Sequence, residues 1–195
     1  TDSTPARFVS GTQPYGAGGF GSAGVRLELV QDSRFPRWTP RHGTVVDLHA
    51  TYYPAVWDVR SAFAEITAAA GVYRTLSVPL RPVLALHGGA KKVFGDFPFQ
   101  EAAFLGGGKN LRTLDLQRYA GDLAVYATAE LRIPVAKVTV LLPLTLGVLG
   151  TVGFGRVYVN GDSPGGWHGA YGPGVWLAFL QFSIEARAMH SADAN

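Results

Sequence analysis

Apolar and polar side chains alternate most regularly between residues 125 and 133. The odd-numbered positions hold small or branched apolar side chains, namely Val125, Ala127, Ala129, Leu131 and Ile133. The even-numbered positions hold Tyr126, Thr128, Glu130 and Arg132. A period of two residues places these sets on opposite faces of a β-strand. The pattern therefore predicts a strand that lies between two different environments.

The same alternation recurs along most of the chain. It predicts further strands over 25–29, 44–52, 62–73, 84–91, 144–159, 171–180 and 182–189. Turns rich in Gly, Pro and charged residues separate these segments, and no helical pattern competes with them. We therefore predict an all-β fold, an antiparallel transmembrane β-barrel of which about eight strands are present.

The same reading sets the expected boundaries. Residues 1–22 lack a period and predict an irregular N-terminal segment, and 94–123 predict a long loop. A short connection is expected over 135–143. Arg156 interrupts an apolar face just after Gly155, which predicts a β-bulge there.

Alternation alone does not say which face is buried. A soluble barrel hides its apolar face inside, whereas a transmembrane barrel turns that face toward lipid and its polar face toward the lumen. Three features favour the membrane. Several segments reach the about 9–11 residues that cross a bilayer with tilt. Their apolar faces are small and smooth, and aromatic residues gather near the predicted strand ends, as in interfacial girdles.

Composition narrows the picture further. The chain has 195 residues, 47% hydrophobic and 16% charged, a low charged fraction for a soluble domain. It has no cysteine, which excludes disulfides, thiolate metal sites and cysteine nucleophiles. The net charge of +3 comes from scattered basic residues, so we expect no nucleic-acid partner. There is no transmembrane helix and no signal peptide, so we expect that a signal was removed or that a longer chain exists.

The segment 105–134, LGGGKNLRTLDLQRYAGDLAVYATAELRIP, resembles the bacterial surface-antigen family of outer-membrane barrels. This superfamily includes the central subunit of the outer-membrane barrel assembly machinery. The resemblance rests on the loop motif Leu111, Arg112, Thr113 and Leu114, on Glu-Leu-Arg-Ile-Pro at 130–134, and on the turn DSRFPRWTPRHG at 32–43. Thr113 and Leu114 stand where the family has glycine and an aromatic residue.

The resemblance implies the C-terminal half of a sixteen-stranded barrel in the bacterial outer membrane. It implies insertion or translocation of outer-membrane proteins, without enzymatic activity, cofactor or metal. The implied partners are the lipid bilayer, unfolded client proteins and other assembly subunits. Half a barrel leaves two open edges, which further strands, or closure of these strands on themselves, must satisfy.

The resemblance also implies that the loop 94–123 folds into the lumen, where Arg112 needs an acidic partner on the wall. Glu130, Glu65 and Glu185 are candidates, and Arg132 shares a strand face with Glu130. An ordinary solvated arginine and a surface ion pair are the competing interpretations. Asp115, Arg118 and Asp122 would extend this network or simply solubilise the loop.

No pattern indicates catalysis. The five histidines lie on separate segments without metal-ligand spacing, and the Gly-rich stretches 16–21 and 106–110 precede no helix that would make a phosphate loop. The alternative that remains open is an outer-membrane enzyme or a soluble barrel that binds lipid or a small ligand.

Overall fold

The computed structural model describes residues 15–16, 19–106, 119–139, 143–162, 165–180 and 182–192. One large antiparallel sheet has the strand order β1-β2-β3-β4-β7-β8-β9-β10, and β11 also pairs with β9. Its strands are β1 (Val25–Asp32), β2 (Gly43–Tyr53), β3 (Phe63–Thr75), β4 (Val83–Phe94), β7 (Leu123–Thr139), β8 (Pro143–Tyr158), β9 (Trp167–Phe179), β10 (Phe182–Arg187) and β11 (His190–Ser191). The predicted all-β antiparallel fold is confirmed.

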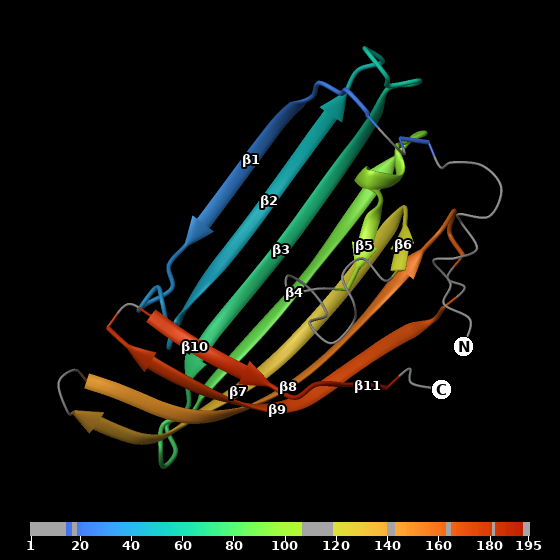
Figure 1. Cartoon of the computed structure of the whole chain (residues 1–195). Coiled ribbons are helices and arrows are strands. Elements are labelled where there is room, and N and C mark those ends of the chain that lie inside the picture. Colours follow the sequence, from blue (N-terminus) through green and yellow to red (C-terminus); the bar gives the residue numbers. More distant parts are fainter. Residues whose placement is uncertain are drawn as a thin grey trace.

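The sheet is curved but not closed into a barrel (Figure 1). One edge is β1. The other is formed by β10 and β11, which keep a single register on β9: Arg187 pairs with Gly174 and His190 with Tyr171. The two segments are therefore one edge strand, interrupted only at 188–189.

Two sequence-based expectations about the strands are wrong. The connection predicted over 135–143 is mostly strand, because β7 continues to Thr139. The bulge predicted beside Gly155 does not form, since β7 and β8 pair without interruption from Leu123 to Pro134. The register shifts between Pro134 and Ala136 instead, at a proline that has no N–H for the ladder.

Helical structure has little part in this fold. The described residues include a short 3-10 turn, Phe99–Glu101 (η2), and no helix long and apolar enough to cross a membrane.

The two faces of the sheet differ sharply. We call the face that carries the buried core the inner face, and the opposite one the outer face. Inner positions on β3 include Phe63 and Glu65, which are 2% and 5% exposed. The neighbouring outer position, Ile66, is 50% exposed. The apolar side of the alternating pattern thus faces outward, and the polar side faces inward.

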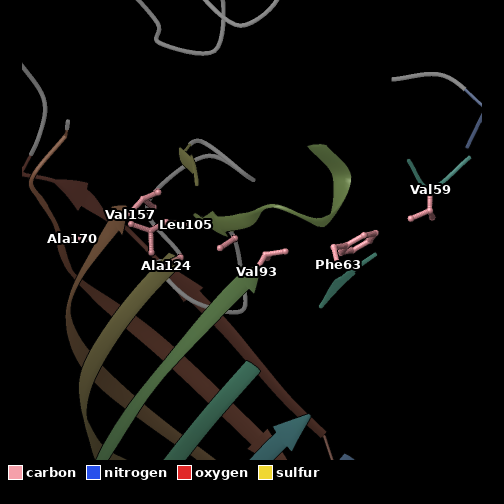
Figure 2. Packing of buried hydrophobic residues seen from close by; sticks show 8 residues of the cluster. Val59, Phe63, Val93, Leu105, Ala124, Val157 and Ala170 are labelled. Carbon is pink, nitrogen blue, oxygen red and sulfur yellow. The ribbon is translucent and has the colours of Figure 1, made fainter. Parts of the chain in front are cut away.

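A short hairpin lies on the inner face, within the curve of the sheet (Figure 1). It consists of β5 (Ala103–Leu105) and β6 (Tyr119–Gly121), and β5 contacts β4, β7 and β8. Figure 2 shows Leu105, which is fully buried, beside Val157 and Ala124. These described ends of the predicted loop 94–123 therefore pack against the sheet.

Glycines make room on the inner face for rings of the neighbouring strand. Three of them stand directly opposite an inner ring: Gly71 opposite His87, Gly89 opposite Tyr126 and Gly147 opposite Trp176. A Cβ at Gly71 would lie 2.5 Å from the His87 ring, and one at Gly89 would lie 2.9 Å from the Tyr126 ring. Such glycines account for part of the 25 in this strand-rich chain.

Replacing Gly147 by alanine tests this packing. The new Cβ would overlap the indole of Trp176, which lies over Gly147. Overpacking of this kind typically costs about 1–3 kcal/mol. We expect Gly147→Ala to lower the free energy of unfolding by that amount in urea unfolding followed by tryptophan fluorescence.

Gly150→Ala is the matched control on the same strand. Gly150 lies on the outer face, and a Cβ there would meet no atom within 4 Å. Its unfolding free energy should stay within about 0.5 kcal/mol of the parent. Equal destabilisation by the two variants would contradict the assigned role of the inner glycine.

Candidate functional site

The four predicted wall residues, Glu65, Glu130, Arg132 and Glu185, lie on the inner face but fall into two groups. Glu130, Arg132 and Glu185 come together in one ion network, whereas Glu65 belongs to another. The loop motif Leu111, Arg112, Thr113 and Leu114 lies outside the described residues.

Four residues form a closed ring of alternating charge, which we call the charge ring: Glu130 and Arg132 of β7, and Glu185 and Arg187 of β10. Glu130 accepts hydrogen bonds from Arg132 Nε and Arg187 Nη1. Arg187 Nη2 donates to Glu185 Oε2 at 2.6 Å, and Arg132 Nη2 lies 3.4 Å from Glu185 Oε1. Each carboxylate thus contacts both guanidinium groups, and the ring is electrically neutral.

The charge ring joins strands that are not neighbours, because β8 and β9 lie between β7 and β10. The side chain of Arg187 can cross β9 because the inner residues of β9 along its path are Gly172 and Gly174. A Cβ at Gly174 would lie 3.1 Å from Cγ of Arg187 and 2.9 Å from Cδ1 of Leu149. The glycines of β9 therefore open the path along which the arginine reaches β7.

Thr151 of β8 supports the charge ring from the intervening strand. It pairs with Glu130 in the β7–β8 register. Its hydroxyl lies 3.3 Å from Glu130 Oε2 and accepts a hydrogen bond from Arg187 Nη1 at 2.7 Å. Side chains of β7, β8 and β10 thus share one hydrogen-bonded network, in which Glu130 is 7% exposed.

Glu65 is held in a separate network near the hairpin end of the inner face. Thr51 donates a hydrogen bond to Glu65 at 3.1 Å, and Lys91 Nζ lies 2.7 Å from its other oxygen. Glu101, in the 3-10 turn, lies 4.0 Å from the same ammonium group. Burial raises the pKa of Glu101, the nearby Glu65 raises it further, and Lys91 lowers it.

An open cleft adjoins the charge ring. Arg132, Trp176 and Glu185 line it from the sheet, and Pro40 and Arg41 line it from the β1–β2 turn. The curvature of the sheet thus brings this turn opposite β9 and β10. Two charged members of the charge ring face this open space.

The histidines do not converge. His49 lies beside Asp47, His87 contacts the Tyr73 hydroxyl, and His168 stacks on Tyr119. Within the described part of the chain, no group of three or more His, Asp or Glu side chains could hold a metal ion.

Sequence reasoning missed Arg187 and Lys91 as members of these networks. Arg187 is two residues from Glu185, the same spacing as between Glu130 and Arg132. The sequence therefore predicts that Arg187 and Glu185 share a face of their strand. The contact of Arg187 with Glu130 of β7 could not be predicted, because it depends on the register of the strands between them. Asp122 forms an ion pair with Lys92 at 2.5 Å, while Asp115 and Arg118 lie outside the described residues.

The charge ring suits a structural role. Each carboxylate is already held by two guanidinium groups, and the Thr151 hydroxyl, which donates to Glu130 at 3.3 Å, accepts a shorter bond from Arg187 at 2.7 Å. The charge ring links β7 to the edge strand β10 through two ion pairs between side chains.

Removing the central carboxylate tests that tie. Glu130→Gln leaves Arg132 and Arg187 with much of their charge uncompensated in a poorly solvated site, where their side chains are 17% and 10% exposed. Breaking one partner of a buried network typically costs about 3–5 kcal/mol. We expect a loss of about 3 kcal/mol in urea unfolding, with faster amide hydrogen exchange along β10.

Glu28→Gln is the control on the other edge strand. Glu28 pairs with Arg26 at 3.2 Å, and the two side chains are about half exposed, at 48% and 47%. Such exposed pairs contribute about 0–1 kcal/mol. If Glu130→Gln were as mild as this control, the charge ring would not hold β10 in place.

Comparison of the chain with protein-family models, curated proteins and solved structures finds no match.

Proposed function

We propose that this chain is part of an integral outer-membrane β-barrel of the surface-antigen type, with a role in the insertion or translocation of other outer-membrane proteins. The observation that carries the membrane location is the inverted polarity of the sheet. The exposed apolar side chains of its outer face range from 37% exposed at Leu131 to 73% at Leu27. The inner face carries both charge networks. Apolar-out and polar-in is the arrangement of a barrel in lipid.

The strand lengths support the same proposal. β3, β4 and β9 have 13, 12 and 13 residues, and β7 and β8 have 17 and 16. A tilted transmembrane strand needs about 9–11 residues. Each of these strands is therefore long enough to cross the hydrocarbon core.

The two open edges of the sheet support the proposal that further strands belong to the same barrel. Unpaired N–H and C=O groups of β1 and of β10–β11 cannot face hydrocarbon without a large free-energy cost. The resemblance at 105–134 implies a sixteen-stranded barrel, of which this sheet would be about half. The remaining strands would then cover both edges.

The role in insertion or translocation rests on that resemblance. An exposed strand edge can template the pairing of an incoming strand by β-augmentation. The segment 111–114 would act as the lumen loop of the family, with the inner-face carboxylates as its wall. The clients would be unfolded outer-membrane proteins.

Single-cysteine labelling tests the membrane location, and the chain has no cysteine to remove first. Ile66 and Thr67 are adjacent on β3 but face outward and inward. In reconstituted vesicles, an environment-sensitive dye on Ile66→Cys should emit at shorter wavelength and be quenched by nitroxide-labelled acyl chains. The dye on Thr67→Cys should respond to iodide in the water instead.

Leu131→Cys and Thr128→Cys on β7 repeat the comparison on another strand. A protein that stays soluble without detergent, with both dyes of each pair quenched by iodide, would overturn the membrane proposal. That outcome would favour a soluble barrel that binds lipid or a small ligand.

A folding assay tests the insertion role separately. Vesicles that contain the chain should speed the folding of a urea-unfolded outer-membrane barrel several-fold over protein-free vesicles, as followed by its heat-modifiable migration in gels. Equal rates, for a chain whose labelled cysteines report membrane insertion, would reject the insertion role and leave the membrane location intact.

A further inference from the structure

The open cleft beside the charge ring brings together two parts of the chain that are far apart in sequence. Thr39, Pro40 and Arg41 of the β1–β2 turn line one side, and inner residues of β4 and of β7 to β10 line the other. In Figure 1, β10 lies near the end of β1 and β2 at which this turn is drawn. A ligand in the cleft would therefore contact the turn at one edge of the sheet and the strand at the opposite edge.

The cleft has an apolar part around Trp176 of β9. The indole ring packs over Gly147 of β8, because a glycine leaves no Cβ between the ring and the sheet. Pro40, Val83 and Pro134 also line the cleft, and the first two of them are buried. Flat aromatic and proline rings offer a surface on which a planar apolar group packs well.

Polar side chains surround this apolar part. Thr39, Thr145 and Ser183 bring hydroxyl groups from the turn, from β8 and from β10. Arg132 and Glu185 belong to the charge ring, in which their charged groups lie 3.4 Å apart. Apolar surfaces combined with a few polar groups are typical of sites that bind small molecules.

Arg41 gives the cleft an excess of positive charge, since two arginines and one glutamate line it. The backbone of Arg41 is held in place, because its carbonyl accepts a hydrogen bond from the Thr75 hydroxyl at 2.9 Å. Within the part of the chain that the structure describes, the Arg41 guanidinium has no carboxylate partner. Arg34 and Arg37 of the same turn, in contrast, both pair with Asp32.

We infer that the cleft binds a small organic carboxylate, with the carboxylate group on Arg41 and the apolar body against Trp176. A guanidinium group matches a carboxylate through two parallel hydrogen bonds. An uncharged ligand of the same shape would lack this contact and bind more weakly. The site goes beyond the proposed role in insertion and does not depend on it, because the cleft lies on the inner face.

Fluorine NMR of a simple aromatic acid tests the site. The full chain, folded in micelles of a non-ionic detergent, is titrated with para-fluorobenzoate or with para-fluorobenzamide, which has the same ring without a charge. The signal of the acid should broaden more than that of the amide. Arg41→Gln should raise the dissociation constant of the acid about tenfold, the typical effect of losing a charge-assisted hydrogen bond. It should leave binding of the amide unchanged.

Arg37→Gln is the matched loss of one positive charge from the same turn. Arg37 does not line the cleft, its side chain is 70% exposed, and it lies 3.5 Å from Asp32. This variant should bind the acid as the parent does. Ala178→Leu keeps Arg41 but places a larger side chain in the cleft, two residues from Trp176, and should abolish binding. It also covers the case in which Arg41→Gln does not fold.

Four outcomes would overturn the site. They are broadening no greater than in protein-free micelles, equal binding of the acid and the amide, an equal loss in Arg37→Gln, and binding that both Arg41→Gln and Ala178→Leu leave unchanged. None of them bears on the membrane location, which the cysteine labelling tests separately.

Discussion

The limited room on the inner face of a curved sheet is the constraint on which the rest of this structure depends. Several inward-pointing rings, and the long side chain of Arg187, lie where the neighbouring strand has no Cβ. Gly71, Gly89 and Gly147 each stand opposite such a ring, and Gly174 makes way for Arg187. The glycines thus act together with the large inner side chains, and a change on either side of a pair is felt by both.

This constraint also separates the two faces chemically. Many inner positions hold glycine, polar or aromatic side chains, and a few hold buried apolar residues such as Val93, Leu149 and Val157, whereas most branched apolar residues lie at outer positions. The ion pairs around Glu65 and Glu130 are stronger on this poorly solvated inner face than they would be in water, and the loss of one partner costs more free energy there. The outer face, in contrast, exposes its apolar side chains, among them Leu27, Ile66 and Val152.

Much of the fold followed from the sequence, for a physical reason. A period of two residues in hydrophobicity indicates that the two faces of a strand lie in different environments. The sequence therefore predicts where the strands are and which residues share a face. Glu130 and Arg132 were found because two residues of one strand share a face. Arg187 was missed as their partner because it reaches them across two strands, a contact that depends on register and on the glycines of β9. A β-bulge was predicted before Arg156, because a cation in an apolar series suggested that the chain changes face there. Instead, Arg156 stays on the outer face, two residues from the end of β8.

The two edges of the sheet are held with unequal strength. Detaching β1 breaks its backbone pairing with β2 but not the exposed pair of Arg26 with Glu28, because both of these residues lie on β1. Detaching β10 breaks its pairing with β9 and also opens the charge ring, which leaves Glu130 and Arg132 without half of their partners on the inner face. The ring therefore adds a cost that β1 does not carry. Because the ring passes over β8 and β9, it resists their separation as well, so β7 to β10 behave as one unit while β1 depends on β2 alone. Local opening of this sheet, in consequence, requires less free energy at its β1 edge.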